Sequence, residues 1–232
     1  MSNAKEFSSN DPPASSIGSA GSVSVLGRGT ALTVAVPAAA QMRELGRRLA
    51  SVLKAGDLMI LSGGLGAGKT TLTQGIGDGL RVRGPITSPT FVIARVHPPL
   101  AADGDGLAAR GPSLVHADAY RLGGVAELDD LDLDTDTASS VTVVEWGEGL
   151  AEGLSADRLE IAITPVAAAR NGSPEANRAG LAGDVTGAEE NGDADCGGED
   201  TLADLPRTVR ILAVGERWEG IELPLLGLAD RL

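Results

Sequence analysis

The chain has 232 residues, of which 42% are hydrophobic and 2% aromatic, so it can bury the core of about one domain with mainly aliphatic side chains. Its net charge is −13, and no cluster of Lys and Arg is present that would grip a nucleic acid. One cysteine and two histidines exclude an intramolecular disulfide and a structural zinc site, and no apolar run predicts a membrane span or a secretory signal.

The N-terminal part of the chain predicts a tail, a strand and a helix. Residues 1–28 are rich in Ser, Gly, Pro and Asn and are predicted to be a disordered tail. Alternating apolar residues over 32–36 indicate a short strand. Pro37 suits the first turn of a helix, apolar residues at helical spacing over 42–54 continue it, and Gly56 is expected to close it.

The next elements surround a glycine-rich turn. Residues 58–61 are a short, fully apolar run, which is typical of a buried strand. After the turn at 63–68, a helix is predicted from 69 to about 80, with Leu72 and Ile76 on its buried face.

Strand patterns dominate the second half of the chain. The predicted strands are residues 91–96, 114–117, 141–145, 159–164 and 209–214, and a short helix is predicted to begin at 216. Residues 97–112, which contain several Pro and Gly, are predicted to be a surface loop. The alternation of strands and helices predicts one α/β domain with a mixed sheet, formed by residues 29–166 and 205–232.

Two stretches carry the whole net charge. Residues 125–140 contain six acids and no base, and residues 167–204 contain nine acids and two bases. The second stretch has no aromatic residue, so it cannot bury enough surface to offset the entropy of ordering and is predicted to be a disordered acidic insertion. The first stretch is interpreted either as a solvated face or as a docking segment for a protein partner.

A phosphate-binding loop is predicted between the second strand and the second helix, because Gly63, Gly68, Lys69 and Thr70 match the pattern G-x4-G-K-[ST]. Its glycines allow successive backbone N–H groups to turn inward, and the following helix directs its positive N-terminal end at the same place. Lys69 is predicted to reach the β- and γ-phosphates of a nucleotide, and the Thr70 hydroxyl to ligate Mg²⁺. The predicted nucleotide-binding residues are Gly63, Gly64, Leu65, Gly66, Ala67, Gly68, Lys69, Thr70 and Thr71.

A phosphate loop needs a second acid that holds or orients the metal and the water. Glu145 ends an apolar strand and is the leading candidate. Asp118 ends another apolar run, where it either reaches the ligand edge of a parallel sheet or caps a loop. His116 is interpreted as a structural residue, and Trp146 either lines the site or packs in the core.

The nucleotide and the reaction are less sharply indicated. None of the five Asn residues is followed by Lys, so the guanine-reading Asn-Lys-x-Asp pattern is absent and ATP is favoured over GTP. The phosphate loop alone leaves three readings open: an ATPase, a small-molecule kinase and a non-catalytic module gated by ATP.

Residues 63–75 closely resemble the phosphate loop of the TsaE (YjeE) ATPases, a family of bacterial tRNA threonylcarbamoyladenosine modification. Weaker similarity spans about 31–166 and 205–232, and Gly64 stands where the family usually has an acid. The other matching segments follow in the same order: Thr87-Ser88-Pro89-Thr90-Phe91, His116-Ala117-Asp118-Ala119-Tyr120-Arg121-Leu122, the acidic run 127–133, Val143-Val144-Glu145-Trp146 and Gly215-Glu216-Arg217-Trp218.

The resemblance implies a P-loop NTPase-like single domain with a mixed, partly antiparallel central sheet flanked by helices. It implies a cytoplasmic ATPase that uses ATP and Mg²⁺, is weak alone, and acts with the threonylcarbamoyl transferase subunit and its inactive paralogue. The tRNA, modified at adenosine 37, would be reached only through that complex, and no membrane is involved. The implied roles are phosphate binding by Lys69, metal binding by Thr70 and Glu145, an essential acid near the γ-phosphate for Asp118, and a switch or partner contact for Ser88, Thr90 and Trp146.

Overall fold

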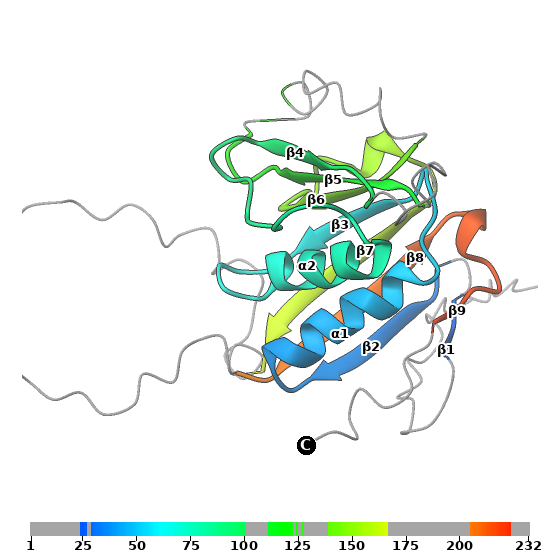
Figure 1. Ribbon diagram of the computed structural model, residues 1–232. Helices are drawn as coiled ribbons and strands as arrows, with labels where there is room; N and C mark the ends of the chain where they lie inside the picture. Colours follow the sequence, from blue (N-terminus) through cyan, green and yellow to red (C-terminus); the bar gives the residue numbers. More distant parts are fainter. Residues whose placement is uncertain are drawn as a thin grey trace, which may run out of the picture.

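The computed structural model describes residues 24–26, 29–100, 111–122, 124, 127, 139–166 and 205–223 (Figure 1). The acidic insertion at 167–204, residues 101–110 of the predicted surface loop and most of the acidic stretch at 125–140 lie outside the described residues. The predictions made for those segments therefore stay predictions.

The centre of the fold is a seven-stranded sheet with the strand order β2-β8-β7-β3-β6-β5-β4. Its strands are β2 (Ala31–Val36), β3 (Leu58–Ser62), β4 (Ala94–His97), β5 (Ser113–Asp118), β6 (Ser140–Glu145), β7 (Arg158–Pro165) and β8 (Arg207–Val214). The four central strands β7, β3, β6 and β5 are mutually parallel, whereas β8, β2 and β4 pair antiparallel with their neighbours. This arrangement confirms the predicted mixed, partly antiparallel sheet.

Two α-helices of 12 residues each, α1 (Ala39–Ala50) and α2 (Lys69–Leu80), lie side by side on one face of the sheet (Figure 1). They approach closely because two glycines face the partner helix. A side chain at Gly46 would collide with the backbone of α2, and one at Gly75 would collide with the backbone of α1. In the described part of the chain, no helix has the length and apolar character needed to cross a membrane.

Apolar side chains pack on both faces of the central strands. Under the two helices, Leu72 and Ile76 are fully buried as predicted, against Met59 and Leu61 from β3. On the opposite face, a smaller cluster contains Leu58, Ile60, Val144 and Ala151 and is covered by the segment around the short 3₁₀ helix η1 (Glu152–Leu154). Because β3 is buried on both faces, its sequence is apolar at every position rather than at alternate ones.

The first helix differs from its prediction at both ends. It begins two residues after Pro37, which therefore precedes the first turn rather than belonging to it. It ends at Ala50, where the N–H and the hydroxyl of Ser51 both donate to the carbonyl of Arg48. The apolar residues that follow pack against the core from a turn, which explains why helical periodicity continued past the helix. Gly56, with φ of 93°, lies in the turn before β3.

The strand predicted over 91–96 is shorter and begins later, because β4 starts only at residue 94. Residues 91–93 form a turn in which the N–H groups of Val92 and Ile93 both donate to the carbonyl of Pro89, at 2.8 and 2.7 Å. Ile93 has φ of 69°, a left-handed conformation that is rare for a β-branched residue. Apolar, β-branched residues in this turn imitate the composition of a strand.

The N-terminal tail was predicted to extend to residue 28, and this is wrong for residues 24–26. Strand β1 (Ser24–Val25) pairs antiparallel with β9 (Glu222–Leu223) in a separate two-stranded sheet. Leu26 is fully buried in the main core, together with Trp218 of the short 3₁₀ helix η5 (Glu216–Trp218). A short apolar segment inside a Ser- and Gly-rich stretch is hidden when composition is averaged over the stretch.

Candidate functional site

The predicted site residues meet at one edge of the sheet. Strands β3, β5 and β6 are parallel, so their carboxyl ends open on the same side, where ligands bind in sheets of this kind. The phosphate loop follows β3, while Asp118 and Glu145 are the last residues of β5 and β6 and are register partners. The two acids and the loop are therefore brought together by strand pairing.

The phosphate loop depends on glycine at its two ends. Gly63 has φ of 139°, and a Cβ atom there would collide with the carbonyl oxygen of Ile163. Gly68 has φ of 110° and is the N-cap of α2, with no side chain capping the helix. The first turn of α2 also contains no acidic residue. The positive end of this helix is thus open toward the loop, which favours an anionic ligand.

A cavity of about 360 Å³ opens at the loop, within the size range of small-ligand sites. It brings together all predicted site residues except Gly63 and Gly64, which instead contact the Lys69 side chain. The predicted residues that line it are Leu65, Gly66, Ala67, Gly68, Lys69, Thr70, Thr71, Ser88, Thr90, Asp118, Glu145 and Trp146.

Lys69 folds back onto the loop. Its ammonium donates to the carbonyls of Gly63 and Gly64, at 2.7 and 3.0 Å, and lies 3.7 Å from the centre of the Trp146 ring. Burial lowers the pKa of Lys69 from 10.5 to about 8, although the carboxylates of Glu145 and Asp118 partly counteract this effect. An anion arriving in the cavity would favour the charged form of this lysine.

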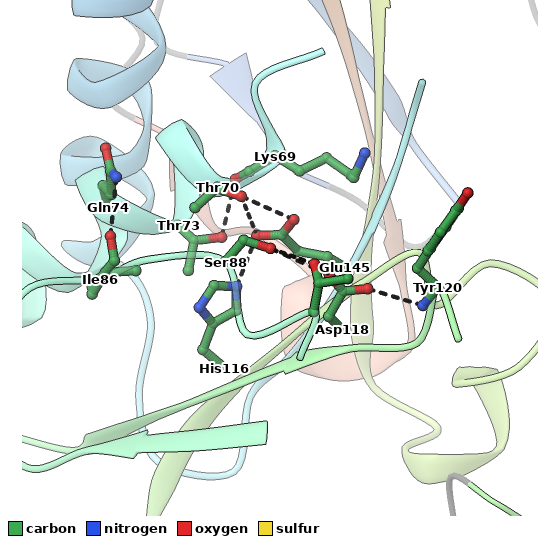
Figure 2. A network of polar contacts seen from close by, with 11 residues as sticks. Lys69, Thr70, Thr73, Gln74, Ile86, Ser88, His116, Asp118, Tyr120 and Glu145 are labelled. Atoms are coloured by element: carbon green, nitrogen blue, oxygen red, sulfur yellow. Dashed lines mark hydrogen bonds and ion pairs between the residues drawn. The ribbon is translucent and has the colours of Figure 1, made fainter. Parts of the chain in front are cut away.

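Glu145 is held by partners on two neighbouring elements (Figure 2). The Thr70 hydroxyl on α2 lies 2.9 and 3.1 Å from its two carboxylate oxygens, and Nε2 of His116 on β5 lies 2.7 Å from Oε1. Glu145 as a residue is 2% exposed, and His116 is fully buried.

The oxygen atoms of Thr70 and Glu145 are ligands of the kind that Mg²⁺ prefers. Among the described residues, no group of three or more His, Cys, Asp or Glu side chains could hold a metal by itself. This donor set fits a Mg²⁺ ion that takes its remaining ligands from nucleotide phosphates and water, which is the usual arrangement for this ion.

Asp118 faces the segment that was predicted to act as a switch (Figure 2). Its Oδ2 atom accepts hydrogen bonds from Thr90 at 2.5 Å and from Ser88 at 3.3 Å, and the two hydroxyls lie 2.7 Å apart. Its Oδ1 atom accepts the N–H of Tyr120 at 2.9 Å. The two alternatives for Asp118 are therefore combined, since the same carboxylate lines the cavity and caps the loop that follows β5.

Trp146 belongs to the cavity wall rather than to the core. It is half-buried, and its ring lies over the Lys69 ammonium and 5.0 Å from the Tyr120 ring, centre to centre. Its backbone has φ of 60°, a strained conformation for a tryptophan. Strain of this kind is common at functional sites.

Sequence reasoning missed one wall of the cavity. Arg207, the first residue of β8, is only 3% exposed, and its Nε donates to the carbonyl of Ala67 at 2.8 Å. A second guanidinium nitrogen donates to the carbonyl of Leu205 at 2.6 Å. Ala39 and Met42 of α1 complete this wall. Arg207 belongs to no motif, and the only signal in the sequence is a charged residue at the start of an apolar strand.

Comparisons with known proteins connect these features with one family. Residues 36–171 match the family model described as threonylcarbamoyl adenosine biosynthesis protein TsaE. The tRNA threonylcarbamoyladenosine biosynthesis protein TsaE of Streptomyces coelicolor is 66% identical over 123 residues, which are 53% of this chain and 78% of that protein. The protein of the same description from Mycobacterium bovis is 48% identical over 140 residues, 58% of this chain and 79% of that protein. The crystal structure of Bacillus subtilis YdiB aligns with a TM-score of 0.49 and 25% identity, over 82% of this chain and 90% of that one.

Proposed function

Since this chain belongs to the TsaE family of threonylcarbamoyl adenosine biosynthesis proteins, we propose that it binds ATP with Mg²⁺ at the phosphate loop and hydrolyses it to ADP and phosphate. The chain takes part in tRNA threonylcarbamoyladenosine biosynthesis, as its relatives do. In the proposal, hydrolysis is weak in the isolated protein and supports repeated turnover of the cytoplasmic complex that modifies adenosine 37.

One observation supports the proposal most directly. Two carboxylates, Asp118 and Glu145, end neighbouring parallel strands and face the same cavity as the phosphate loop. A loop that binds phosphate needs only backbone N–H groups and a cation, whereas hydrolysis also needs acids that hold a metal and orient a water. The presence of both acids in the cavity therefore favours an ATPase over a module that only binds ATP.

Each side chain has a distinct proposed role. The inward N–H groups of the loop and the Lys69 ammonium hold the β- and γ-phosphates. Thr70 and Glu145 supply protein ligands for Mg²⁺, which when bound neutralises charge that develops on the phosphates. Asp118, which already accepts hydrogen bonds from two hydroxyls, orients the attacking water.

The proposed protein partners are the threonylcarbamoyl transferase subunit and its inactive paralogue. The support for them is the resemblance to the TsaE family, whose members from Streptomyces coelicolor and Mycobacterium bovis are named for tRNA threonylcarbamoyladenosine biosynthesis. A net charge of −13 without a basic cluster is poorly suited to direct binding of tRNA, whose phosphates require grouped Lys and Arg. Contact with the tRNA is therefore proposed to be indirect, through the complex.

The reaction is tested by measuring phosphate release from ATP by the full-length protein, with no acceptor added, in Mg²⁺ and in EDTA. Release that needs Mg²⁺ but no acceptor supports the ATPase. Release that appears only after a metabolite is added would instead identify the small-molecule kinase. Adding the transferase subunit and its paralogue should raise the rate, and failure to bind them in a pulldown would overturn the partner assignment.

The phosphate loop is tested with a matched pair of lysines. Lys69→Ala removes the buried ammonium, whereas Lys54→Ala removes an exposed lysine outside the cavity. A hydrogen bond from a charged group contributes about 1.5–3 kcal/mol, so the Lys69 variant should bind ATP roughly 10–100-fold more weakly. The Lys54 variant should bind like the wild type, and equal affinities for all three proteins would contradict phosphate binding by Lys69.

A further inference from the structure

His116 is a buried hydrogen-bond partner of Glu145 and has no role in the proposed reaction. It lies on β5 two residues before Asp118, so that both side chains project from the same face of the strand. Figure 2 shows the imidazole and the Thr70 hydroxyl approaching the Glu145 carboxylate from different elements. Neither member of the His116–Glu145 pair is more than 3% exposed at its side chain.

The direction of this hydrogen bond follows from the chemistry of the two groups. An ionised carboxylate only accepts hydrogen bonds, so Nε2 of His116 must carry the proton and donate it. The other ring nitrogen, Nδ1, is buried without a hydrogen-bond partner among the described residues. The hydrogen bonding of this ring is therefore directed at Glu145 alone within the described structure.

Packing does not explain a histidine at this position. The neighbouring positions on the same faces of β5 and β6 are the fully buried Leu114, Val141 and Val143. An aliphatic residue would fill such a place without burying two polar nitrogens, and burying polar groups costs free energy unless they are hydrogen-bonded. The 2.7 Å bond to Glu145 is the feature that an aliphatic residue could not supply.

We propose that His116 is a positioning residue that fixes the orientation of the Glu145 carboxylate for Mg²⁺; this inference rests on the proposed function. The terminal torsion of a glutamate is broad, so an unrestrained carboxylate rotates easily. Thr70 contacts both carboxylate oxygens and distinguishes them poorly, at 2.9 and 3.1 Å, whereas His116 binds only Oε1. His116 therefore fixes Oε1 of Glu145 on the side of β5, which would leave the other oxygen, Oε2, available to the ion.

The test measures how strongly Mg²⁺ improves ATP binding. For each protein, isothermal titration gives the dissociation constant of ATP in Mg²⁺ and in EDTA, and the ratio of the two constants is the coupling between metal and nucleotide. His116→Gln places an amide N–H near the position of Nε2, whereas His116→Asn reaches only the position of Nδ1. Loss of a hydrogen-bonding partner behind a metal ligand typically reduces metal affinity about 10–100-fold.

His116→Asn should therefore reduce the coupling about tenfold or more while leaving ATP binding in EDTA nearly unchanged. His116→Gln should restore most of the coupling. A merely structural role would lower the melting temperature of both variants without separating their couplings. Equal coupling in wild type and His116→Asn, or equal loss in the Asn and Gln variants, would overturn the inference.

His97 on β4 provides the matched control. Like His116, it is buried, at 3% exposure, and one of its ring nitrogens, Nε2, lacks a partner among the described residues. Unlike His116, it has no hydrogen bond to Asp118 or Glu145 within the described structure. His97→Asn should lower thermal stability without changing the coupling. If the wild type itself shows no coupling, the proposed Mg²⁺ site fails. If the wild type shows coupling and His116→Asn retains it, the inference about His116 fails while the proposed Mg²⁺ site stands.

A measurement without substitution covers the case in which the variants do not fold. Nitrogen-15 NMR of the wild-type histidines reports which ring nitrogen carries the proton. The proposal requires a proton on Nε2 of His116, the ring nitrogen that lies 2.7 Å from Glu145. The Nδ1–H form would overturn the inference.

Discussion

Asp118 and Glu145 are register partners at the ends of adjacent strands, yet they are held in different ways. The partners of Glu145 belong to regular elements, Thr70 on α2 and His116 on β5. The hydroxyl partners of Asp118, Ser88 and Thr90, belong to the irregular segment before β4. One carboxylate is thus fixed by the framework of the domain, while the other is tied to a segment without regular secondary structure.

The segment that contacts Asp118 is also more exposed than His116, which contacts Glu145. Phe91, directly after Thr90, is 85% exposed, with the guanidinium of Arg121 over its ring at 4.7 Å. The left-handed backbone of Ile93 follows. A carboxylate fixed by helix and strand suits a metal ligand, whereas a carboxylate bound to an exposed turn couples the position of that turn to events in the cavity. Three predictions below test this division, from the largest expected effect to the smallest, and two smaller effects expected from Lys69 follow them.

The largest effect is expected for Glu145→Gln. The substitution keeps the size of the side chain but removes the charge that the metal requires, so phosphate release should fall by roughly 10²–10³. The dependence of ATP affinity on Mg²⁺ should also disappear in titrations with and without EDTA. Glu148→Gln, at an exposed acid three residues later, is the control and should behave like the wild type. If ATP affinity still depended on Mg²⁺ in Glu145→Gln, the assignment of Glu145 as a metal ligand would be wrong.

Asp118→Asn should also slow phosphate release, by about 10², because orienting and activating a water contributes at least this much. Unlike the Glu145 variant, it should retain the Mg²⁺ dependence of ATP affinity. Single-turnover measurements at saturating ATP isolate the chemical step from binding. If both variants lose Mg²⁺ coupling to the same extent, the two carboxylates act as one metal site and the proposed division is wrong.

Thr90→Val removes one hydroxyl that binds Asp118 and keeps the shape of the side chain. A hydrogen bond to a charged group contributes about 1.5–3 kcal/mol, but Ser88 can replace part of it, so the rate should fall roughly tenfold. ATP affinity should change less than twofold, as measured by titration. Thr33→Val, at an exposed position on β2, is the matched control. A large loss of ATP affinity in Thr90→Val would show instead that the segment before β4 contributes to ATP binding itself.

The smallest effect is a pH dependence caused by Lys69. Its pKa is about 8 in the free protein, and bound phosphates favour the charged form, so ATP binding should take up a proton above that pH. At pH 8.5 the affinity should be about fourfold weaker than at neutral pH, as expected for a group with this pKa. Titrations in buffers with different ionisation enthalpies measure the uptake. Lys69→Arg, if it binds ATP, should take up no proton.

The same pKa shift affects the stability of the free protein. The pKa of Lys69 is lower in the folded state than the usual 10.5, so between about pH 8 and 10.5 the unfolded chain binds more protons than the folded one. The contribution of Lys69 to the free energy of unfolding should therefore rise with pH through this window. Comparison of wild type and Lys69→Met by chemical denaturation at pH 7.5 and 9.5 isolates this contribution, and an opposite sign would contradict it.

The parts of the site that could be predicted are those with a local signal. The phosphate loop, α2 and the burial of Leu72 and Ile76 follow from glycine spacing and apolar periodicity within about twenty residues. Asp118 and Glu145 could be named because each ends an apolar strand, although only strand pairing makes them neighbours. For these residues, the structure expected from the local sequence is the structure found in the fold.

The parts that could not be predicted depend on contacts between distant segments. Arg207 reaches the loop at Ala67, 140 residues earlier in the chain, and no pattern in either segment indicates the other. His116 reads as an ordinary buried residue until β6 places Glu145 beside it. The turn at Ile93 was mistaken for a strand, because β-branched composition does not reveal a left-handed backbone.

The position of β8 has a consequence for the order in which the chain can fold during synthesis. Among the described residues of the main sheet, β2 is the first strand to be made and pairs only with β8, which begins at Arg207. At ~5–20 residues per second, a ribosome needs roughly seven to thirty seconds to pass from the phosphate loop to that strand, 140 residues later. The nascent chain therefore contains the whole phosphate-binding motif well before its first strand has a neighbour or its loop has the arginine. Premature termination after the insertion would leave a protein with a complete motif and an unfinished nucleotide site.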